Sequence, residues 1–576
     1  MKSKKIHFSS SDIISNLPEA LLCHILSFLP IKDSALTSVL SKKWRYLFAF
    51  RPNLDFDGLV NNLHHREDGN RDEINRMFMD FVNRVLGLQG NSIVNKFSLK
   101  CGIDVDPVCV ISWIVNVLER GVSDLDLRVS VDRGELPSKV FMSESLVRLR
   151  IESQNVSAID VEDVFLPKLK TLYLDTVMLG KAGDYFDKLL SGCHVLEELV
   201  MINVYSDFRN RSVSSKTLKR LKLCCIEYDQ IPDTVSFDTP NLVYLEYSDY
   251  VADKYPRVNF CSLFEAFLNL HMTYDQCAQA SYGDLVGNVT DFLMGVSNVQ
   301  ILHLSDRSLE VLTFCCEPIP VFNSLTHLTI KTHRHGEVGW ESLPALLKKC
   351  PNLETLVFQG LHHKDTIKCE EVDGCLCKYS EDIPTCLSSS PVKVVKVWKF
   401  GEKNYYYNDI KKQIEQVKHF LETMPNLEQM ILYYDTPYDD DVLEVSKQLQ
   451  MLTRVASAKC KIQIGSSSLS VSTLQFRSRA GLFNIMSAAA TTRHTSWIVA
   501  SAIAAVEARW NYPLRFFNKD VKARLRAIAV TSRPPSSASS SSSADLVKDN
   551  HPMPKSEASM ERVMGLSCFG PTTVRF

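Results

Sequence analysis

A short pattern of apolar residues, apolar-x-x-apolar-x-apolar, recurs along most of this 576-residue chain. Neighbouring copies commonly start about 22 to 28 residues apart, with wider gaps of 36 to 39 later in the chain. Because side chains alternate between the two faces of a strand, the last two positions of each copy predict a short strand with one buried face. Clear copies are Leu146/Leu149/Ile151, Leu169/Leu172/Leu174, Leu196/Leu199/Met201 and Leu218/Leu221/Leu223.

One strand per period of about 20 to 29 residues, with a helix or turn between strands, is the unit of a leucine-rich repeat. A single unit cannot cover its apolar face, so the units stack into a curved solenoid with a concave parallel sheet. The same pattern also arises by chance in amphipathic helices, but its recurrence favours the solenoid. We therefore expect an α/β fold with degenerate repeats over residues 94–382, in which Leu172 and Leu199 point into the core.

Residues 12–57 predict a small bundle of three helices in front of the repeats. Pro18 suits the first turn of the first helix and Pro30 ends that helix. Asp33 and Ser41 are candidate caps of two further short helices, the last of which would carry Trp44. Three helices in about forty residues have too little core to cover all their apolar side chains, so the uncovered surface indicates a partner.

This segment resembles the F-box of the large plant F-box family, and we assign residues 8–57 to it. The residues that carry the resemblance occur in order: Asp12, Ile14, Leu17-Pro18, Ile25 to Pro30, Lys32-Asp33, Thr37 to Ser41 and Trp44 to Leu47. The resemblance implies docking onto the Skp-type adaptor of a cullin–RING ubiquitin ligase. An ordinary helical cap on the repeat domain is the alternative. The expected adaptor-binding residues are Leu17, Pro18, Leu21, Ile25, Leu26, Leu29, Val39, Leu40 and Trp44.

Residues 383–464 resemble the FBD domain of plant F-box/LRR proteins. Their pattern predicts strand, helix, strand, helix, strand, which would cap the last apolar face of the solenoid. The resemblance rests on Ile383 to Leu387, Val392 to Val397, Lys411 to Phe420, Met424 to Met430 and Ser457 to Ile462.

Composition and charge exclude several classes of protein. The formal net charge of −2 argues against a nucleic-acid binder held by whole-domain electrostatics. The basic start, Met1 to Lys5, is not followed by the apolar region of a secretory signal. The apolar stretch Trp497 to Val506 is too short to span a bilayer. We expect an intracellular protein, in the nucleus or cytoplasm, with reduced cysteines and no nucleic-acid or membrane partner.

Metal, cofactor and catalytic sites are not expected. No phosphate-binding loop, nucleophile elbow or metalloprotease motif occurs at a strand-to-helix junction. Asp439 to Asp441 lacks the other ligands of a calcium loop, and Lys331 to His335 is a basic cluster that predicts a loop. One cysteine-rich cluster lacks any CxxC pair and does not match the usual zinc spacings. It consists of His362, His363, Cys369, Cys375, Cys377 and Cys386.

The composition changes after Ile464. Residues 465–485 predict a polar linker, and residues 486–576 predict a mostly disordered tail with one or two helices and a serine tract. The tail has 12 Lys and Arg against 6 Asp and Glu, which gives it a net charge of +6. Because the whole chain has a net charge of −2, the first 485 residues have a net charge of −8. The tail resembles the plant wound-responsive protein family, through Ser496 to Ala508, Arg509 to Arg515 and Glu561 to Pro571. The alternative is a basic tail with no dedicated role.

Together these features predict a non-catalytic substrate receptor of an SCF-type ubiquitin ligase, with an unknown protein substrate and unknown substrate-binding residues. The runner-up is a repeat scaffold that binds partners without ubiquitylation, with the C-terminal module acting in wound or stress response. The role of the FBD domain is not determined by the family.

The junction before Met486 predicts either a genuine fusion or two neighbouring genes merged in one reading frame. We prefer merging, because the residues that the wound-responsive family has ahead of Arg509 are missing. Long-read transcript sequencing should therefore find separate transcripts on either side of codons 465 to 486. A single abundant transcript across that junction, with peptides that span it, would reject merging.

Overall fold

A computed structural model describes most of the chain up to residue 473. The linker beyond that residue, the C-terminal tail and the second predicted FBD helix lie outside the described residues. The described residues are 14, 17–58, 71–102, 104–129, 136–159, 163–179, 185–204, 210–225, 232–280, 286–332, 339–362, 385–401, 410–434, 460–466 and 469–473.

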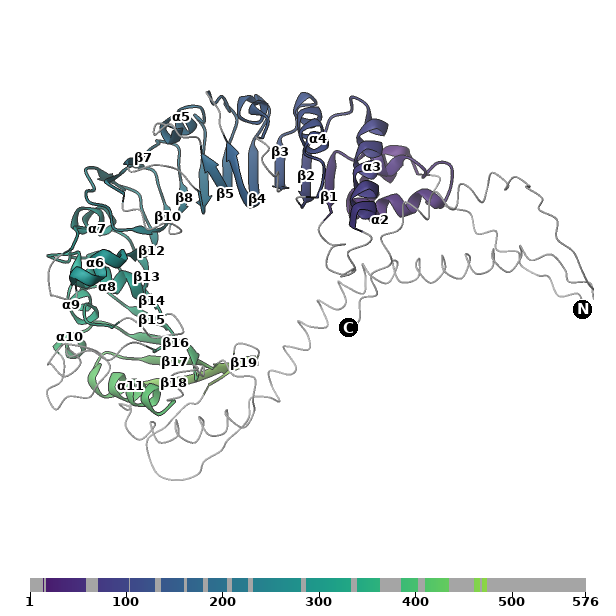
Figure 1. The fold of residues 1–576 in the computed structure, drawn as a ribbon. Coiled ribbons are helices and arrows are strands. Elements are labelled where there is room, and N and C mark those ends of the chain that lie inside the picture. The colour runs from purple at the N-terminus through teal and green to yellow at the C-terminus, as the bar shows by residue number, and fades with distance from the viewer. Residues whose placement is uncertain are drawn as a thin grey trace, which may run out of the picture.

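The described part forms an arc with strands on its inner side and helices on its outer side (Figure 1). A 16-stranded sheet lines the inner side, and its strands follow chain order except that β7, β9 and β11 lie elsewhere. Neighbouring strands pair in parallel up to β18, while β19 is antiparallel to β18. The strands are β1 Asn53–Asp57, β2 Lys96–Cys101, β3 Asp124–Val129, β4 Arg148–Ile159, β5 Thr171–Leu179, β6 Glu198–Ile202, β8 Arg220–Cys224, β10 Tyr244–Tyr250, β12 Glu265–His271, β13 Ile301–Ser305, β14 His327–Lys331, β15 Thr355–Gln359, β16 Val394–Phe400, β17 Gln429–Tyr434, β18 Lys461–Ser466 and β19 Leu469–Thr473.

The repeat pattern places its apolar residues in the core as predicted. In every copy from Val94 to Leu432 the three apolar positions are buried. Leu172 and Leu199 are both 0 % exposed and lie in register on β5 and β6. The apolar rows therefore stack from strand to strand, which is how each repeat covers its neighbour.

The sheet begins earlier than the repeat pattern predicts. Strand β1 precedes the first predicted copy, and its Leu54 and Phe56 pair in register with Phe97 and Leu99 of β2. At the other end, β18 and β19 extend into residues 465–485, which the sequence predicts as a linker. The first three elements of the predicted FBD pattern are β16, α11 and β17, and β18 corresponds to its last strand.

Helices and a second sheet cover the outer side of the solenoid. The second sheet has three strands, in the order β11, β9, β7, and the repeat pattern did not predict it because that pattern specifies inner strands only. These outer elements are α3 Arg71–Gln89, α4 Pro107–Glu119, η5 Ser138–Met142, α5 Tyr185–Ser191, β7 Asn210–Ser214, β9 Thr234–Asp238, β11 Val258–Asn259, α6 Tyr274–Ala280, α7 Thr290–Val296, α8 Asp306–Phe314, α9 Leu343–Lys348, α10 Thr385–Ser388 and α11 Ile410–Thr423.

A buried ion pair ties the second sheet to the first. Arg211 on β7 bonds to Asp249 on β10, whose carboxylate is fully buried and also accepts the Tyr247 hydroxyl at 3.1 Å. Burial raises the pKa of Asp249, while Arg211 acts to lower it. A buried carboxylate needs such partners, since an unpaired charge inside a protein is very costly.

The N-terminal bundle consists of α1 Glu19–Ser27, α2 Ile31–Leu36 and the 3-10 turns η1 Thr37–Val39 and η2 Leu47–Phe50. Pro18 and Pro30 are the N-cap residues of α1 and α2, so the prediction of a cap at Asp33 is wrong. The third helix, predicted to carry both Trp44 and Leu47, is the 3-10 turn η2, which holds Leu47 but not Trp44, since Trp44 lies in the turn before it. Phe48, Ala49 and Arg51 are all buried, and a regular helix would expose one side of this segment.

Replacing Leu172 or Leu199 by Ala should lower the free energy of unfolding by about 2–5 kcal/mol, because each change leaves a cavity in a tightly packed row. Urea denaturation monitored by circular dichroism measures this change. The control is Val243→Ala, at a position that is 45 % exposed, which should change stability by less than about 0.5 kcal/mol. Equal, small effects at all three sites would contradict the stacked-row geometry.

Candidate functional site

The N-terminal bundle exposes an unusual number of apolar side chains. Leu21 and Ile25 on α1 and Phe28 directly after it are 49 %, 42 % and 76 % exposed. Val39 and Leu40, which follow α2, are 55 % and 39 % exposed. Exposed apolar side chains gathered on one small unit mark an interaction surface.

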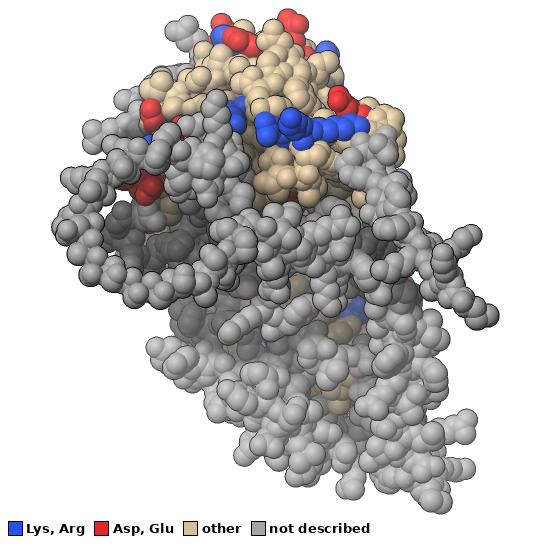
Figure 2. All heavy atoms as spheres, turned by 90° about the vertical axis from the view of Figure 1, so that its right-hand side faces the viewer, with Lys and Arg blue, Asp and Glu red and all other residues tan. Residues whose placement is uncertain are grey.

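Figure 2 views this end of the molecule and shows uncharged side chains over much of its coloured surface, crossed by a row of Lys and Arg side chains. Lys42, Lys43 and Arg45 are exposed and directly follow the apolar residues in sequence. The ammonium of Lys43 also donates to the Leu17 carbonyl oxygen at 2.8 Å, which ties this turn to the start of α1. The apolar surface is therefore accompanied by positive charge.

The predicted adaptor-binding residues separate into three groups by burial. Leu26 and Trp44 are 0 % and 5 % exposed, so they pack inside the bundle and support its surface rather than form it. Leu17 and Leu29 are half-buried against the core. The exposed members are Pro18, Leu21, Ile25, Val39 and Leu40.

Other exposed apolar residues were missed by the sequence analysis. Phe28 is the most exposed of them, and it completes a stripe with Leu21 and Ile25 at helical spacing. A separate stripe through Leu22 and Leu26 is buried, so α1 carries two apolar stripes with different roles. The spacing of Leu21, Ile25 and Phe28 is the sequence signal that could have identified Phe28 as part of a second apolar stripe. The missed residues are Ile14, Phe28, Leu36, Tyr46 and Phe50.

Arg51 fixes the shape of the bundle. Its guanidinium donates from Nη1 to the Leu29 carbonyl oxygen at 2.6 Å and to Ser34 Oγ at 3.1 Å, and from Nη2 to the Ser27 carbonyl oxygen at 3.4 Å. The two carbonyl groups lie at and just beyond the C-terminal end of α1, where no backbone N–H of the helix is available to donate to them. Burial lowers the pKa of Arg51 and raises that of Asp55, so desolvation opposes the charged state of both members of this ion pair. The hydrogen bonds of Arg51 to Ser27, Leu29 and Ser34 connect the end of α1 to α2 and to the start of β1.

The same segment joins the bundle to the solenoid. The Arg51 carbonyl oxygen accepts from Gln89 Nε2 of α3 at 2.9 Å, and Gln89 Oε1 accepts from Arg120 at 3.1 Å. Phe48 of η2 stacks with Phe81 of α3 at a ring distance of 6.5 Å. Arg51 also directly precedes Pro52 and β1, the first strand of the sheet. The exposed stripe is therefore held in a fixed position relative to the concave face.

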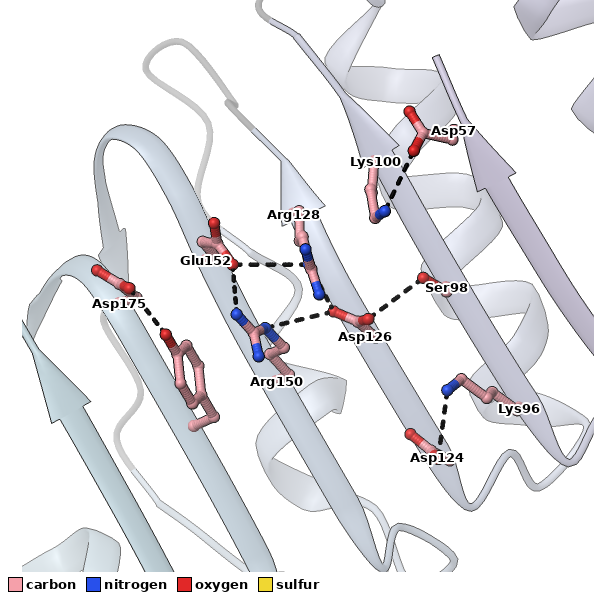
Figure 3. A network of polar contacts seen from close by, with 11 residues as sticks. Asp57, Lys96, Ser98, Lys100, Asp124, Asp126, Arg128, Arg150, Glu152 and Asp175 are labelled. Atoms are coloured by element: carbon pink, nitrogen blue, oxygen red, sulfur yellow. Dashed lines mark hydrogen bonds and ion pairs between the residues drawn. The ribbon is translucent and has the colours of Figure 1, made fainter. Parts of the chain in front are cut away.

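A polar network covers the concave face near this junction (Figure 3). Asp126 pairs with Arg128 at 3.4 Å and with Arg150 at 3.7 Å. Glu152 pairs with the same two arginines, at 3.6 Å and 2.7 Å. Burial acts to lower the pKa of Arg150, but Glu152 and Asp126 raise it overall. The charges in this region are paired with one another, both within β3 and β4 and between these two strands.

Charge pairing continues in the middle of the concave face, together with aromatic stacking. Lys222 pairs with Glu246 at 2.8 Å, and the Arg220 guanidinium lies 4.1 Å from the Tyr244 ring centre. Phe267 and His303 stack with ring centres 3.7 Å apart. Burial and nearby carboxylates raise the pKa of Tyr244 to about 12. This region therefore offers rings and already paired charges.

The other candidate sites of the sequence analysis lie mostly beyond the described residues. Among the described residues, no group of three or more His, Cys, Asp or Glu is arranged to hold a metal ion. No helix within that same part is long and apolar enough to cross a membrane. His362 is described, whereas His363, Cys369, Cys375, Cys377 and Asp439 to Asp441 are not, nor is the side chain of Cys386.

Comparison with known proteins defines the class to which this architecture belongs. The F-box domain family model matches residues 14–54, which hold α1, α2 and both 3-10 turns of the bundle. The family model described as FBD-associated F-box protein At5g56370, LRR repeats, matches residues 110–260. The model described as Wound-induced protein matches residues 499–571. The chain thus combines an F-box, leucine-rich repeats and a wound-induced-type segment.

Curated relatives share the first two parts with this chain. F-box/LRR-repeat protein At3g59250 of Arabidopsis thaliana is 63 % identical over 455 residues, which are 79 % of this chain and 97 % of the relative. Putative F-box/FBD/LRR-repeat protein At3g59240 of the same plant is 59 % identical over 79 % of this chain and 89 % of its own length. Putative F-box/LRR-repeat protein At3g59230, also of Arabidopsis thaliana, is 55 % identical over 82 % of this chain and 98 % of its own length. The chain belongs to the family of plant F-box/LRR-repeat proteins.

Replacing Arg51 by Ala should loosen the F-box without unfolding the solenoid. Each buried carbonyl that loses its donor costs about 1–3 kcal/mol, and these carbonyls end α1. Hydrogen exchange should therefore become faster in α1 and α2 and stay unchanged in β5 and β6. The control is Arg148→Ala, because the Arg148 side chain is 69 % exposed and makes only a 3.8 Å surface ion pair. Unchanged exchange in α1 would show that Arg51 does not hold the bundle.

Proposed function

We propose that this chain is the substrate-recognition subunit of an SCF-type ubiquitin ligase. The observation that carries the proposal is the exposed stripe of Leu21, Ile25 and Phe28 on an F-box whose core is already complete. An F-box implies a Skp-type adaptor as the partner of that stripe, and the solenoid is then the part that binds a protein substrate. The exposed residues Pro18, Val39 and Leu40 would extend the adaptor contact.

The role requires no catalytic residue in this chain. The receptor would hold a substrate near a ubiquitin-charged conjugating enzyme, which raises the effective concentration of substrate lysines around the reactive thioester. A defined distance between adaptor and substrate favours this role. The contacts of Arg51 and Gln89, which join the F-box to α3 and β1, support such a defined distance.

A non-ubiquitylating scaffold is the second candidate. It would use the same solenoid to assemble partners, and the match to the Wound-induced protein model at residues 499–571 favours a role in wound or stress response. The two candidates differ in one property, because only the ligase subunit needs the exposed stripe of the F-box. Binding to a Skp-type adaptor therefore separates them.

Replacing both Leu21 and Ile25 by Ala should weaken binding to a Skp-type adaptor by about 2 kcal/mol or more, since exposed apolar anchors dominate interface energies. Isothermal titration of the full chain with the adaptor measures this loss. The control is Val108→Ala on α4, which is 72 % exposed but lies outside the F-box. Circular dichroism should show that both variants remain folded.

Two results would reject the ligase assignment. One is that the wild-type chain does not bind any Skp-type adaptor tested. The other is that the folded double variant binds as tightly as the wild type, which would place the adaptor contact elsewhere. Either result would favour the scaffold.

A further inference from the structure

The concave face changes its charge pattern near the end of the solenoid. In β1 to β6, Asp and Glu are interleaved with Lys and Arg. The described strands β14 to β18 contain no Asp, Glu or Arg, but they contain four lysines: Lys331, Lys396, Lys399 and Lys461. This change marks out a region whose charges are all of one sign.

Lys331, Lys396 and Lys461 lie on the concave side. Lys396 stands between Val395 and Val397, which are both fully buried, so its side chain points away from the core. Lys331 and Lys461 are exposed at the end of β14 and the start of β18. Their strand neighbours Ile330 and Ile462 are buried, which gives the same orientation.

Strand register places the three lysines on a diagonal. Lys331 aligns through Gln359 with Trp398, two residues after Lys396. Lys461 aligns through Gln429 with Val394, two residues before Lys396. From Lys331 to Lys396, and again from Lys396 to Lys461, the position shifts by two strands across the sheet and by two residues toward the strand N-terminus. With strands about 4.8 Å apart and about 3.3 Å per residue, neighbouring lysine positions are about 12 Å apart.

These lysine charges are not neutralised by the described part of the chain. Among the ion pairs of the described residues, none joins Lys331, Lys396 or Lys461 to a carboxylate. Glu354 and Glu428 precede β15 and β17 at the rim, and Glu354 pairs with Lys393 at 2.9 Å. In its row across the sheet, Lys396 has Val357 and Ile431 as neighbours. Among the described residues, the row neighbours of Lys396 therefore bring no opposite charge to its ammonium.

An exposed aromatic pair lies beside the diagonal. Trp398 and Tyr433 stack with ring centres 3.8 Å apart and planes at 5°. Trp398 is 39 % exposed, and the next residue, Lys399, has φ of 55° at an irregularity in the pairing of β16 with β17. A bulge of this kind redirects side chains and often lies near a functional site.

We propose that this basic–aromatic zone, formed by Lys331, Lys396, Lys461 and the Trp398–Tyr433 pair, binds an extended acidic segment of the substrate protein. The inference rests on the proposed role of the solenoid as substrate receptor. An extended chain covers 12 Å in three to four residues, so the segment carries Asp or Glu at that spacing and an apolar or aromatic residue against Trp398.

Separate carboxylates fit this zone better than one phosphate does. Phosphate recognition favours clustered arginines that bind two oxygens at once, whereas these are single ammonium groups about 12 Å apart. The chain's own C-terminal segment is a poor occupant, because residues 486–576 carry 12 Lys and Arg against 6 Asp and Glu. We take the occupant to be an acidic stretch of the substrate protein.

A peptide selection tests this proposal. The full chain by itself is used to select from a random pool of peptides about 12 residues long, long enough to span the diagonal, and the pool includes phosphoserine. The selected peptides should be enriched in Asp or Glu at spacings of three to four residues, together with Trp, Tyr, Phe or Leu. Their affinity should fall as salt concentration rises, because the attraction is between exposed charges.

Variants assign the binding to the zone. Lys396→Glu and Lys331→Glu should each weaken the best acidic peptide at least tenfold, and Trp398→Ala should remove the preference for an aromatic residue but keep that for acidic residues. The matched control is Lys418→Glu on the outer helix α11, where Lys418 is 48 % exposed. This control makes the same charge change and should leave peptide affinity unaltered.

The result is independent of adaptor binding, which is measured on the same samples. Four outcomes would overturn the proposal: no enrichment, enrichment of basic peptides, stronger enrichment of phosphoserine than of Asp and Glu, or equal loss of affinity in Lys418→Glu. None of these would alter the affinity for the adaptor, so failure here is distinguishable from failure of the ligase assignment.

Discussion

The stacking of buried apolar rows across a parallel sheet is the constraint on which the rest of this structure depends. Leu172 of β5 lies beside Leu199 of β6, and the same register continues from Leu54 in β1 to Ile462 in β18. Because strand side chains alternate, fixing the buried rows also fixes which residues face the concave side. The chemistry of that face is thus a consequence of packing in the core.

Strand register determines whether a charged side chain on the concave face lies beside an opposite charge, and this differs between the two ends of the sheet. Near the F-box, Asp126 and Arg150 come opposite each other and neutralise their charges. Near the other end, Lys396 comes opposite Val357 and Ile431, which carry no charge that could pair with its ammonium. Self-paired charges already satisfy one another and offer a partner little net attraction, whereas unpaired charges give both affinity and selectivity. The two ends of one sheet therefore differ in the charge that they present to a partner.

Arg51 links the two proposed binding surfaces through backbone carbonyl groups. Its guanidinium donates to the Leu29 carbonyl oxygen after α1, and its own carbonyl oxygen accepts from the Gln89 side chain of α3. An adaptor bound at Leu21 and a substrate bound on the sheet would then keep a defined separation. A flexible linker at this junction would spread that separation over many values and lower the effective concentration of the reactants.

The sequence by itself determined the repeats, the buried leucine positions and the F-box, because these depend on local periodicity that a single chain displays. It listed the buried Leu26 and Trp44 among the adaptor-binding residues and left out the exposed Phe28, because the sequence alone does not show which apolar stripe the core covers. Only the tertiary structure decided the outer sheet, the hydrogen bonds of Arg51 and the diagonal of Lys331, Lys396 and Lys461. These lysines are distant in sequence, and only strand register brings them together.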